Sequence, residues 1–308
     1  MLSRLAQNLF WAGRYLERAE SSARLINATT LLLLDLPRQT EFDWRALVEI
    51  VGADDLFGQR YPDGTETSVM RFLTVDRVHP GSIASSVAMA RENLRSARDL
   101  IPREVWEEVN GLHLFMADEG QQIERRLARS RVMDRVVRTV RLTAGQIESG
   151  MSRDAAYDML WLGLSIERAD MTTRVIDVRS SDLLIDDHAD LQPYQTVQWI
   201  SVLKSLSAFQ MYRRHVRSRV SGASVVRFLL SDMAFPRSTR FCLHQAEARL
   251  ARLPAPGACA DRLHDAIGVL SNADFSRLSG HRLSEFLDRM QIELNRFNDA
   301  LRVRYFEL

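Results

Sequence analysis

The chain has 308 residues, of which 46% are hydrophobic and 26% are charged, and its formal net charge is +1. This composition is typical of a folded globular protein, and it excludes a disordered chain and a general polyanion binder. The two cysteines, Cys242 and Cys259, form no metal or redox spacing and suit a reducing compartment. No signal peptide is recognisable, and the apolar run 31–34 ends at Asp35, far too soon to cross a bilayer. We therefore expect a cytoplasmic protein that does not enter a membrane.

An internal repeat runs through the sequence, and its two copies agree best in a charged segment. Residues 11–20 (WAGRYLERAE) align with residues 161–170 (WLGLSIERAD) at an offset of 150. Residues 71–73 and 227–229 (both RFL) align at an offset of 156, and single matches between these blocks keep the same order. Matches at a slowly growing offset need only a few inserted residues, so the sequence predicts a duplicated unit.

Apolar residues spaced alternately four and three apart predict one long helix in each copy. The first pattern runs from Leu5 to Ile26 and the second from Ala155 to Ile176. Such spacing is typical of the apolar seam of a packed helix. Pro37 is the expected end of the first helix.

Shorter helices are expected after each long one, because strand signals are weak everywhere. Pro80 and Pro236 stand where helices should begin, followed by Ser82 and Ser238 as N-cap residues. The expected helices span residues 42–53, 65–76, 81–100, 102–128, 130–148, 152–180, 194–219, 222–231, 237–253, 258–270 and 279–304. The expected loops comprise residues 58–64, residues 254–257 and an acidic connection at 182–193, interpreted as solvated because its spacing suits a cation poorly. The predicted fold class is all-α, an internally duplicated helical bundle with two pseudo-equivalent halves, 1–150 and 151–308, packed as one compact unit.

The charged segment places the same stripe of side chains on both long helices. The stripe comprises Gly13, Glu17, Glu20 and Arg24 in the first copy and Gly163, Glu167, Asp170 and Arg174 in the second. Arg14, Arg18 and Arg168 stand beside it. An exposed i to i+4 ion pair contributes only a few tenths of a kcal/mol, about 0.3–0.5, which is too little to explain why both copies keep it.

Two interpretations of this centre stay open. It can be a buried ion network that locks the halves together near a pseudo-twofold axis, where losing one partner costs roughly 3–5 kcal/mol. It can instead be a site for a zwitterion, a peptide terminus or a phosphate, since the planar fork of arginine binds such groups at two points.

A second repeated set of charges is weaker, and other constellations are absent. The set comprises Arg71 and Asp76 in the first copy and Arg227 and Asp232 in the second, interpreted as structural pairs on core-facing helices. The sequence has no Glu-x-x-His pair for a dimetal bundle and no glycine-rich phosphate loop. Its arginine clusters are interspersed with acids, as on a solvated face. We therefore expect no metal, no cofactor and no nucleic acid partner.

The strongest marks of the sequence resemble a known family. Residues 13–20 (GRYLERAE), 166–170 (IERAD) and 235–238 (FPRS) look like the bacterial alpha-E family, a helical domain with a Glu-Arg motif. The resemblance covers almost the whole chain. Leu164 and Ser165 depart from it, because the family tends to carry arginine and an aromatic residue there.

The resemblance implies a setting more than a reaction. Alpha-E proteins are usually encoded beside, or fused to, a circularly permuted ATP-grasp protein that is similar to amide ligases. A transglutaminase-like cysteine peptidase is often encoded nearby. By this analogy the chain is an accessory component of a peptide-forming or peptide-modifying system, with both proteins as expected partners and a peptide or an anionic small molecule as the expected ligand.

Two functional hypotheses of different classes follow. The first is a non-catalytic partner or scaffold, which predicts a stable complex and no turnover by the chain alone. The second is an enzyme that uses Glu17 and Glu167 as acid-base groups while arginines hold the substrate. The second predicts a polar cleft at the pseudo-twofold axis and a carboxylate whose pKa is raised.

Overall fold

The computed structural model describes residues 3–35, 43–184 and 192–307, and throughout these ranges every regular element is helical. The predicted all-α fold class is therefore confirmed. The elements of the first part are α1 (Ser3–Asp35), α2 (Ala46–Val51), α3 (Asp54–Arg60), α4 (Glu66–Thr74), α5 (Ile83–Ser96), η1 (Arg98–Leu100), α6 (Arg103–Asp118), η2 (Gly120–Glu124) and α7 (Arg126–Gly150). Those of the second part are α8 (Ala155–Leu184), α9 (Gln192–Ser205), α10 (Phe209–His215), α11 (Gly222–Ser231), α12 (Thr239–Leu250), α13 (Ala258–Ser271), α14 (His281–Leu301) and the terminal turn η4 (Arg302–Phe306).

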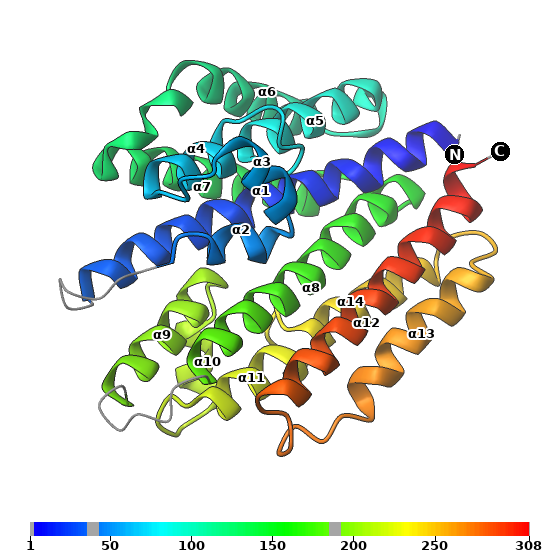
Figure 1. Cartoon of the computed structure of the whole chain (residues 1–308). Coiled ribbons are helices and arrows are strands. Elements are labelled where there is room, and N and C mark those ends of the chain that lie inside the picture. The colour runs from blue at the N-terminus through cyan, green and yellow to red at the C-terminus, as the bar shows by residue number, and fades with distance from the viewer. Residues whose placement is uncertain (1–2, 36–42, 185–191, 308) are drawn as a thin grey trace.

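The two long helices, α1 and α8, lie side by side through the middle of the molecule (Figure 1). Helices α4, α5 and α6 lie on one side of this pair, and α11 to α14 lie on the other. One continuous hydrophobic core extends across both groups and includes Leu16 of α1 and Ile166 of α8. The apolar seams that the sequence predicts therefore face this shared core.

Two glycines allow α1 and α8 to approach closely. A Cβ atom on Gly13 would lie 2.1 Å from the carbonyl oxygen of Leu160, and one on Gly163 would lie 2.0 Å from that of Phe10. No real side chain tolerates such distances, so both positions require glycine. The two contacts are reciprocal at an offset of 150, as a duplicated pair of helices requires. The duplication itself stays a prediction of the sequence.

The predicted N-caps are confirmed. The hydroxyl of Ser82 accepts a hydrogen bond from the backbone of Ser85 at the start of α5, and Ser238 accepts one from Phe241 at the start of α12. Helix α5 packs on α1 and α12 packs on α8. The turns before these two helices are thereby brought beside the charged segments of α1 and α8.

Several predicted boundaries are wrong. The helix expected over 102–128 ends at Asp118, because the chain turns at Gly120 and buries Ile123. The helix expected over 194–219 breaks at Ser207, whose φ of 53° does not occur in a right-handed helix. The loop expected at 58–64 begins later, since α3 continues to Arg60.

Two predictions fall partly or wholly outside the described residues. Pro37 lies outside them, and so does most of the acidic connection 182–193, of which α8 includes the start and α9 the end. Among the helices that the structure does describe, none is long and apolar enough to cross a membrane.

Candidate functional site

Glu17 is completely buried where α1 faces α8. Its Oε2 accepts a hydrogen bond from Arg168 Nε at 2.8 Å. Its Oε1 accepts hydrogen bonds from Arg237 Nη1 and, at 3.2 Å, from the Ser21 hydroxyl. Both oxygens of this carboxylate are therefore occupied by protein donors.

Glu20 lies one turn further along α1 and is held by three guanidiniums. Arg237 Nη2 lies 2.9 Å from its Oε2, while Arg141 Nε and Arg24 Nε lie 3.0 and 3.6 Å from its Oε1. Arg24 and Arg141 also donate to the hydroxyl of Ser207, at 3.1 and 2.6 Å. We call this arrangement the closed side; it comprises Glu17 and Glu20 with Arg24, Arg141, Arg168 and Arg237.

Glu167 of α8 is the counterpart of Glu17 and is equally buried. Arg18 Nε donates to its Oε1 at 2.6 Å, and Arg14 Nε donates to its Oε2 at 2.6 Å. Each long helix thus sends an arginine to the glutamate of the other, Arg18 to Glu167 and Arg168 to Glu17. These crossed pairs join α1 to α8.

Asp170 corresponds to Glu20 but has fewer partners. Arg174 Nε lies 3.0 Å from its Oδ1, and Arg14 Nη2 lies 3.8 Å from its Oδ2. Its side chain is 13% exposed, whereas that of Glu20 is 1% exposed. We call this arrangement the open side; it comprises Glu167 and Asp170 with Arg14, Arg18 and Arg174.

The guanidiniums keep the buried carboxylates ionised. Burial alone would raise the pKa of Glu20 and Glu167, but the adjacent arginines outweigh burial and lower both pKa values to about 2. Burial acts against the charge of Arg18 and Arg237 as well, yet their carboxylate partners raise the pKa of each guanidinium. Burial and the neighbouring Arg237 lower the pKa of Arg24 to about 9.

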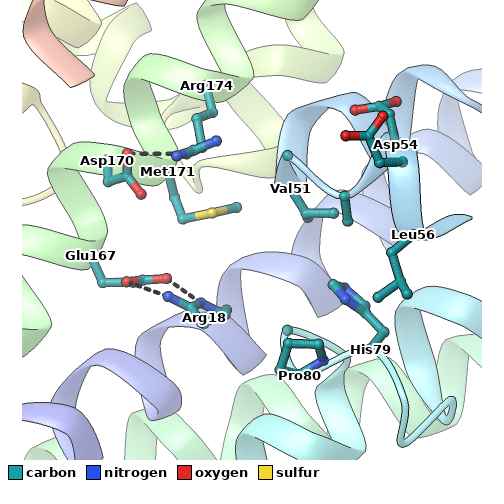
Figure 2. Close-up of a pocket in the computed structure, with 14 residues that line it drawn as sticks. Arg18, Val51, Asp54, Leu56, His79, Pro80, Glu167, Asp170, Met171 and Arg174 are labelled. Carbon is teal, nitrogen blue, oxygen red and sulfur yellow. Dashed lines mark hydrogen bonds and ion pairs between the residues drawn. The ribbon is translucent and has the colours of Figure 1, made fainter. Parts of the chain in front are cut away.

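A cleft of about 600 Å³ opens beside the open side (Figure 2). This volume is within the range of small-molecule sites. Its walls come from the end of α2, the start of α3, the turn before α5 and the facing parts of α1 and α8. The residues that line it are Arg18, Val51, Gly52, Ala53, Asp54, Asp55, Leu56, His79, Pro80, Gly81, Glu167, Asp170, Met171 and Arg174. No residue of the closed side is among those that line this cleft.

The structure brings every predicted residue of the charged centre into this one assembly. It does not do so for the second repeated set of charges. Arg71 and Arg227 are exposed, on helices α4 and α11 whose other faces are buried in the core. A residue beside a core-facing Phe on a helix points about 100° away from it, which explains their exposure.

The aspartates of that second set have other partners. Asp76 accepts hydrogen bonds from Arg60 at 3.0 Å and from the Tyr61 hydroxyl at 2.9 Å. Asp232 lies 3.1 Å from His215 Nδ1 and accepts backbone N–H groups at the turn before α12. Both aspartates therefore stabilise the turns that lead to α5 and α12, and neither belongs to the charged centre.

Sequence reasoning missed three members of the centre. In the sequence Arg237 stands out only as part of the FPRS motif, although it contacts both Glu17 and Glu20. No local pattern marks Arg141 or Ser207, because they come from α7 and from the break after α9. No group of three or more His, Cys, Asp or Glu side chains that could hold a metal occurs in the ranges that the structure covers.

The class of protein is defined by an all-helical fold in which the Glu-Arg dipeptides of two central helices form ion pairs with each other. Residues 1–306 match the Alpha-E family, described as a predicted alpha-helical domain with a conserved ER motif. The chain belongs to this family, and Glu17-Arg18 and Glu167-Arg168 are the Glu-Arg dipeptides of α1 and α8.

Curated relatives occur in mycobacteria. The chain is 24% identical over 271 residues to an uncharacterized protein of Mycobacterium bovis and to two of Mycobacterium tuberculosis. The match covers 82% of this chain but only 30% of each relative, so the chain spans less than a third of their length. No solved structure matches the chain.

Proposed function

We propose that this chain is a non-catalytic binding protein, an accessory component of a system that makes or modifies peptides. The observation that carries the proposal is the burial and complete pairing of the two central glutamates. Glu17 and Glu167 are buried, and both oxygens of each accept bonds from arginine. Groups held in this way lock α1 against α8 and have no free oxygen for a substrate.

The same state argues against the acid-base alternative. A general acid or base works best when its pKa lies near the operating pH. The pKa of Glu167 is about 2, because Arg14 and Arg18 outweigh burial. The enzyme hypothesis requires a raised pKa, so the geometry supports a structural lock with a binding cleft beside it.

The proposed partners are an ATP-grasp, ligase-like protein and a transglutaminase-like peptidase. The family membership supports this setting by analogy only. The relatives add a second argument, because the matched region makes up only 30% of each of their chains. A helical unit joined to so much further sequence is expected to act together with other domains.

The test is co-expression with the proposed ATP-grasp, ligase-like partner, followed by size-exclusion chromatography and an ATP-turnover assay. We expect co-elution, higher turnover by the ligase in the complex, and no turnover by the chain alone. Failure to form a complex, with unchanged ligase turnover, would remove the proposal.

A matched pair of variants separates a lock from a catalytic group. Glu17→Gln is expected to lose the complex only to the extent that it loses the folded state, as measured by circular dichroism. Glu107→Gln, on the exposed face of α6, is expected to change neither. If the Glu17→Gln chain stays fully folded and still binds the ligase-like protein, but the complex no longer turns over ATP, the result would favour the enzyme hypothesis instead.

A further inference from the structure

The closed and open sides differ at several aligned positions, and one of them lies in the turn that precedes α5 and α12. Pro80 aligns with Pro236 and Ser82 with Ser238 at an offset of 156, so Gly81 aligns with Arg237. Arg237 inserts its guanidinium between Glu17 and Glu20. Gly81 has no side chain to send toward Glu167 and Asp170, and it lines the cleft.

The surroundings of this missing side chain match those of Arg237. Gly52 and Ser207, aligned at an offset of 155, both have a positive φ, of 65° and 53°. Nη1 of Arg174 would lie 2.8 Å from a Cβ on Gly52, and Nη1 of Arg24 donates to Ser207 at 3.1 Å. Arg18 and Arg168 make the crossed pairs on the two sides. On the closed side Arg237 bonds both acids, whereas on the open side Arg14 bonds Glu167 but makes no hydrogen bond to Asp170. The unfilled part of the open side is therefore the space beside Asp170.

The open side has acceptors left for a further guanidinium. Arg14 Nη2 is 3.8 Å from Asp170 Oδ2, too far for a hydrogen bond. Arg141, which bonds Glu20 on the closed side, has no counterpart among the ion pairs of Asp170 in the described residues.

Two further acids stand at the mouth of the cleft. Asp54 and Asp55 line it, and the positions aligned with them at an offset of 155 are the uncharged Phe209 and Gln210. Partial desolvation and the neighbouring Asp55 carboxylate raise the pKa of Asp54. Carboxylates outnumber guanidiniums along the cleft walls, which favours a cationic ligand.

His79 supplies an independent indication of a ligand. Its side chain is 4% exposed and borders the cleft, yet neither ring nitrogen has a hydrogen-bond partner within the described parts of the chain. Burial and the charge of Arg18 lower the pKa of His79 to about 4, so the ring is neutral and one nitrogen is an acceptor. Figure 2 shows the ring pointing into the cleft, between Arg18 and Leu56. Buried polar groups in proteins normally have partners, and here the missing partner fits a ligand N–H.

We propose that the cleft binds a guanidinium group of a ligand, held by Asp170, the Asp54 and Asp55 carboxylates and His79, on the side of the cleft where Gly81 stands in the aligned position of Arg237. A guanidinium has five N–H donors and keeps its charge, which suits a site lined by carboxylates and a neutral imidazole. The group can belong to a free small molecule or to an arginine side chain of a peptide. The proposal holds whether or not the chain serves a ligase-like partner.

The experiment is calorimetric titration of the isolated chain with four probes: free arginine, a short capped peptide containing arginine, the same peptide with lysine, and the same peptide with glutamate. We expect saturable binding of one arginine probe per chain, with at least about tenfold weaker binding of the lysine peptide, because lysine cannot satisfy several acceptors in one plane. The stronger of the two arginine probes identifies the source as a small molecule or a peptide.

The decisive variant fills the cleft from within. A Cβ on Gly81 would lie 2.9 Å from the ring of His79. His79→Phe is therefore combined with Gly81→Arg, which reproduces the Phe235-Pro236-Arg237 order of the closed side. We expect this double variant to fold with an unchanged or higher Tm and to lose arginine binding.

A charge-matched pair completes the test. Asp55→Asn is expected to weaken arginine binding by about tenfold, as for loss of a charge-assisted contact. Asp265→Asn, an equal change of net charge on exposed α13, is expected to leave it unchanged. The proposal is overturned by absence of saturable arginine binding, by a preference for the glutamate peptide, or by undiminished arginine binding to the folded double variant.

Discussion

The closed and open sides of the α1–α8 pair use the same scaffold for different ends. Both have a buried glutamate reached by an arginine from the opposite helix, at 2.8 Å on the closed side and 2.6 Å on the open side. On the closed side Arg237 completes the network, whereas on the open side Gly81 leaves a cleft of about 600 Å³. The Gly81/Arg237 difference, together with the fewer partners of Asp170, thus distinguishes a side that stabilises the fold from one that remains accessible to a ligand.

The difference shows how one charged pattern can serve both hypotheses that the sequence leaves open. The crossed pairs fit the lock, because their carboxylates are buried and fully paired. The second acids differ: Glu20 has three guanidiniums around it, while Asp170 has one close partner and is partly exposed. Locking and binding are therefore properties of neighbouring residues in a single centre.

The largest expected effect concerns the helix crossing on which both sides depend. Gly13→Ala and Gly163→Ala each place a Cβ about 2 Å from a backbone oxygen, at 2.1 and 2.0 Å. We expect each to lower the free energy of unfolding by more than ~4 kcal/mol, measured by urea denaturation. Gly145→Ala in α7, where a Cβ meets nothing within 4 Å, should instead stabilise by about 0.5–1 kcal/mol. Unequal losses of unfolding free energy in Gly13→Ala and Gly163→Ala would contradict the prediction that the two glycine contacts are equivalent.

Acid should destabilise both sides together. The pKa of Glu20 and of Glu167 is about 2 in the folded protein, against an ordinary value of 4.5. Because the folded state binds fewer protons, the stabilisation is fully present above pH 4.5 and is lost as the pH falls toward 2. Each carboxylate contributes on the order of 3 kcal/mol in this window.

The measurement is the free energy of unfolding as a function of pH. Glu167→Gln should flatten its fall between pH 4.5 and 2, relative to the wild-type chain. Glu107→Gln, at an exposed pair, should leave the slope unchanged. An unaltered slope in Glu167→Gln would show that the open side does not hold an ionised buried carboxylate.

The second acids should distinguish the two sides most directly. Glu20→Gln leaves three guanidiniums without their carboxylate in a buried place, so we expect a loss of roughly 3 kcal/mol. Asp170→Asn removes one close ion pair from a partly exposed place, so we expect a loss of about 1 kcal/mol. Equal losses, measured by chemical denaturation of both variants, would contradict the distinction between closed and open.

Much of this architecture could be predicted from the sequence, because it depends on local patterns. The alternating spacing that begins at Leu5 and at Ala155 identifies both long helices, and Ser82 and Ser238 identify the starts of α5 and α12. Glu17 lies on the charged stripe that both copies share, and the buried-network interpretation of that stripe predicts charged partners for it.

The rest of the centre depends on contacts between distant segments. Arg237 reaches Glu17 across 220 residues of sequence, and Arg141 reaches Glu20 across 121. The helix break at Ser207, where Arg24 and Arg141 donate to its hydroxyl, has no glycine or proline to mark it. Periodicity describes one helix at a time, so it cannot place a partner that arrives from another helix.

The smallest expected effect tests the repeated charges that lie outside the centre. Arg71 and Arg227 occupy aligned positions on α4 and α11 and are both exposed. Arg71→Ala and Arg227→Ala should therefore change the free energy of unfolding by no more than about 0.5 kcal/mol. Asp76→Asn, which weakens the bonds from Arg60 and Tyr61, should cost about 1–2 kcal/mol and is the matched positive control in thermal and urea melts. If either arginine variant loses as much unfolding free energy as Asp76→Asn, that arginine contributes to the stability of the fold. The repeated charges outside the centre would then be structural, contrary to this prediction.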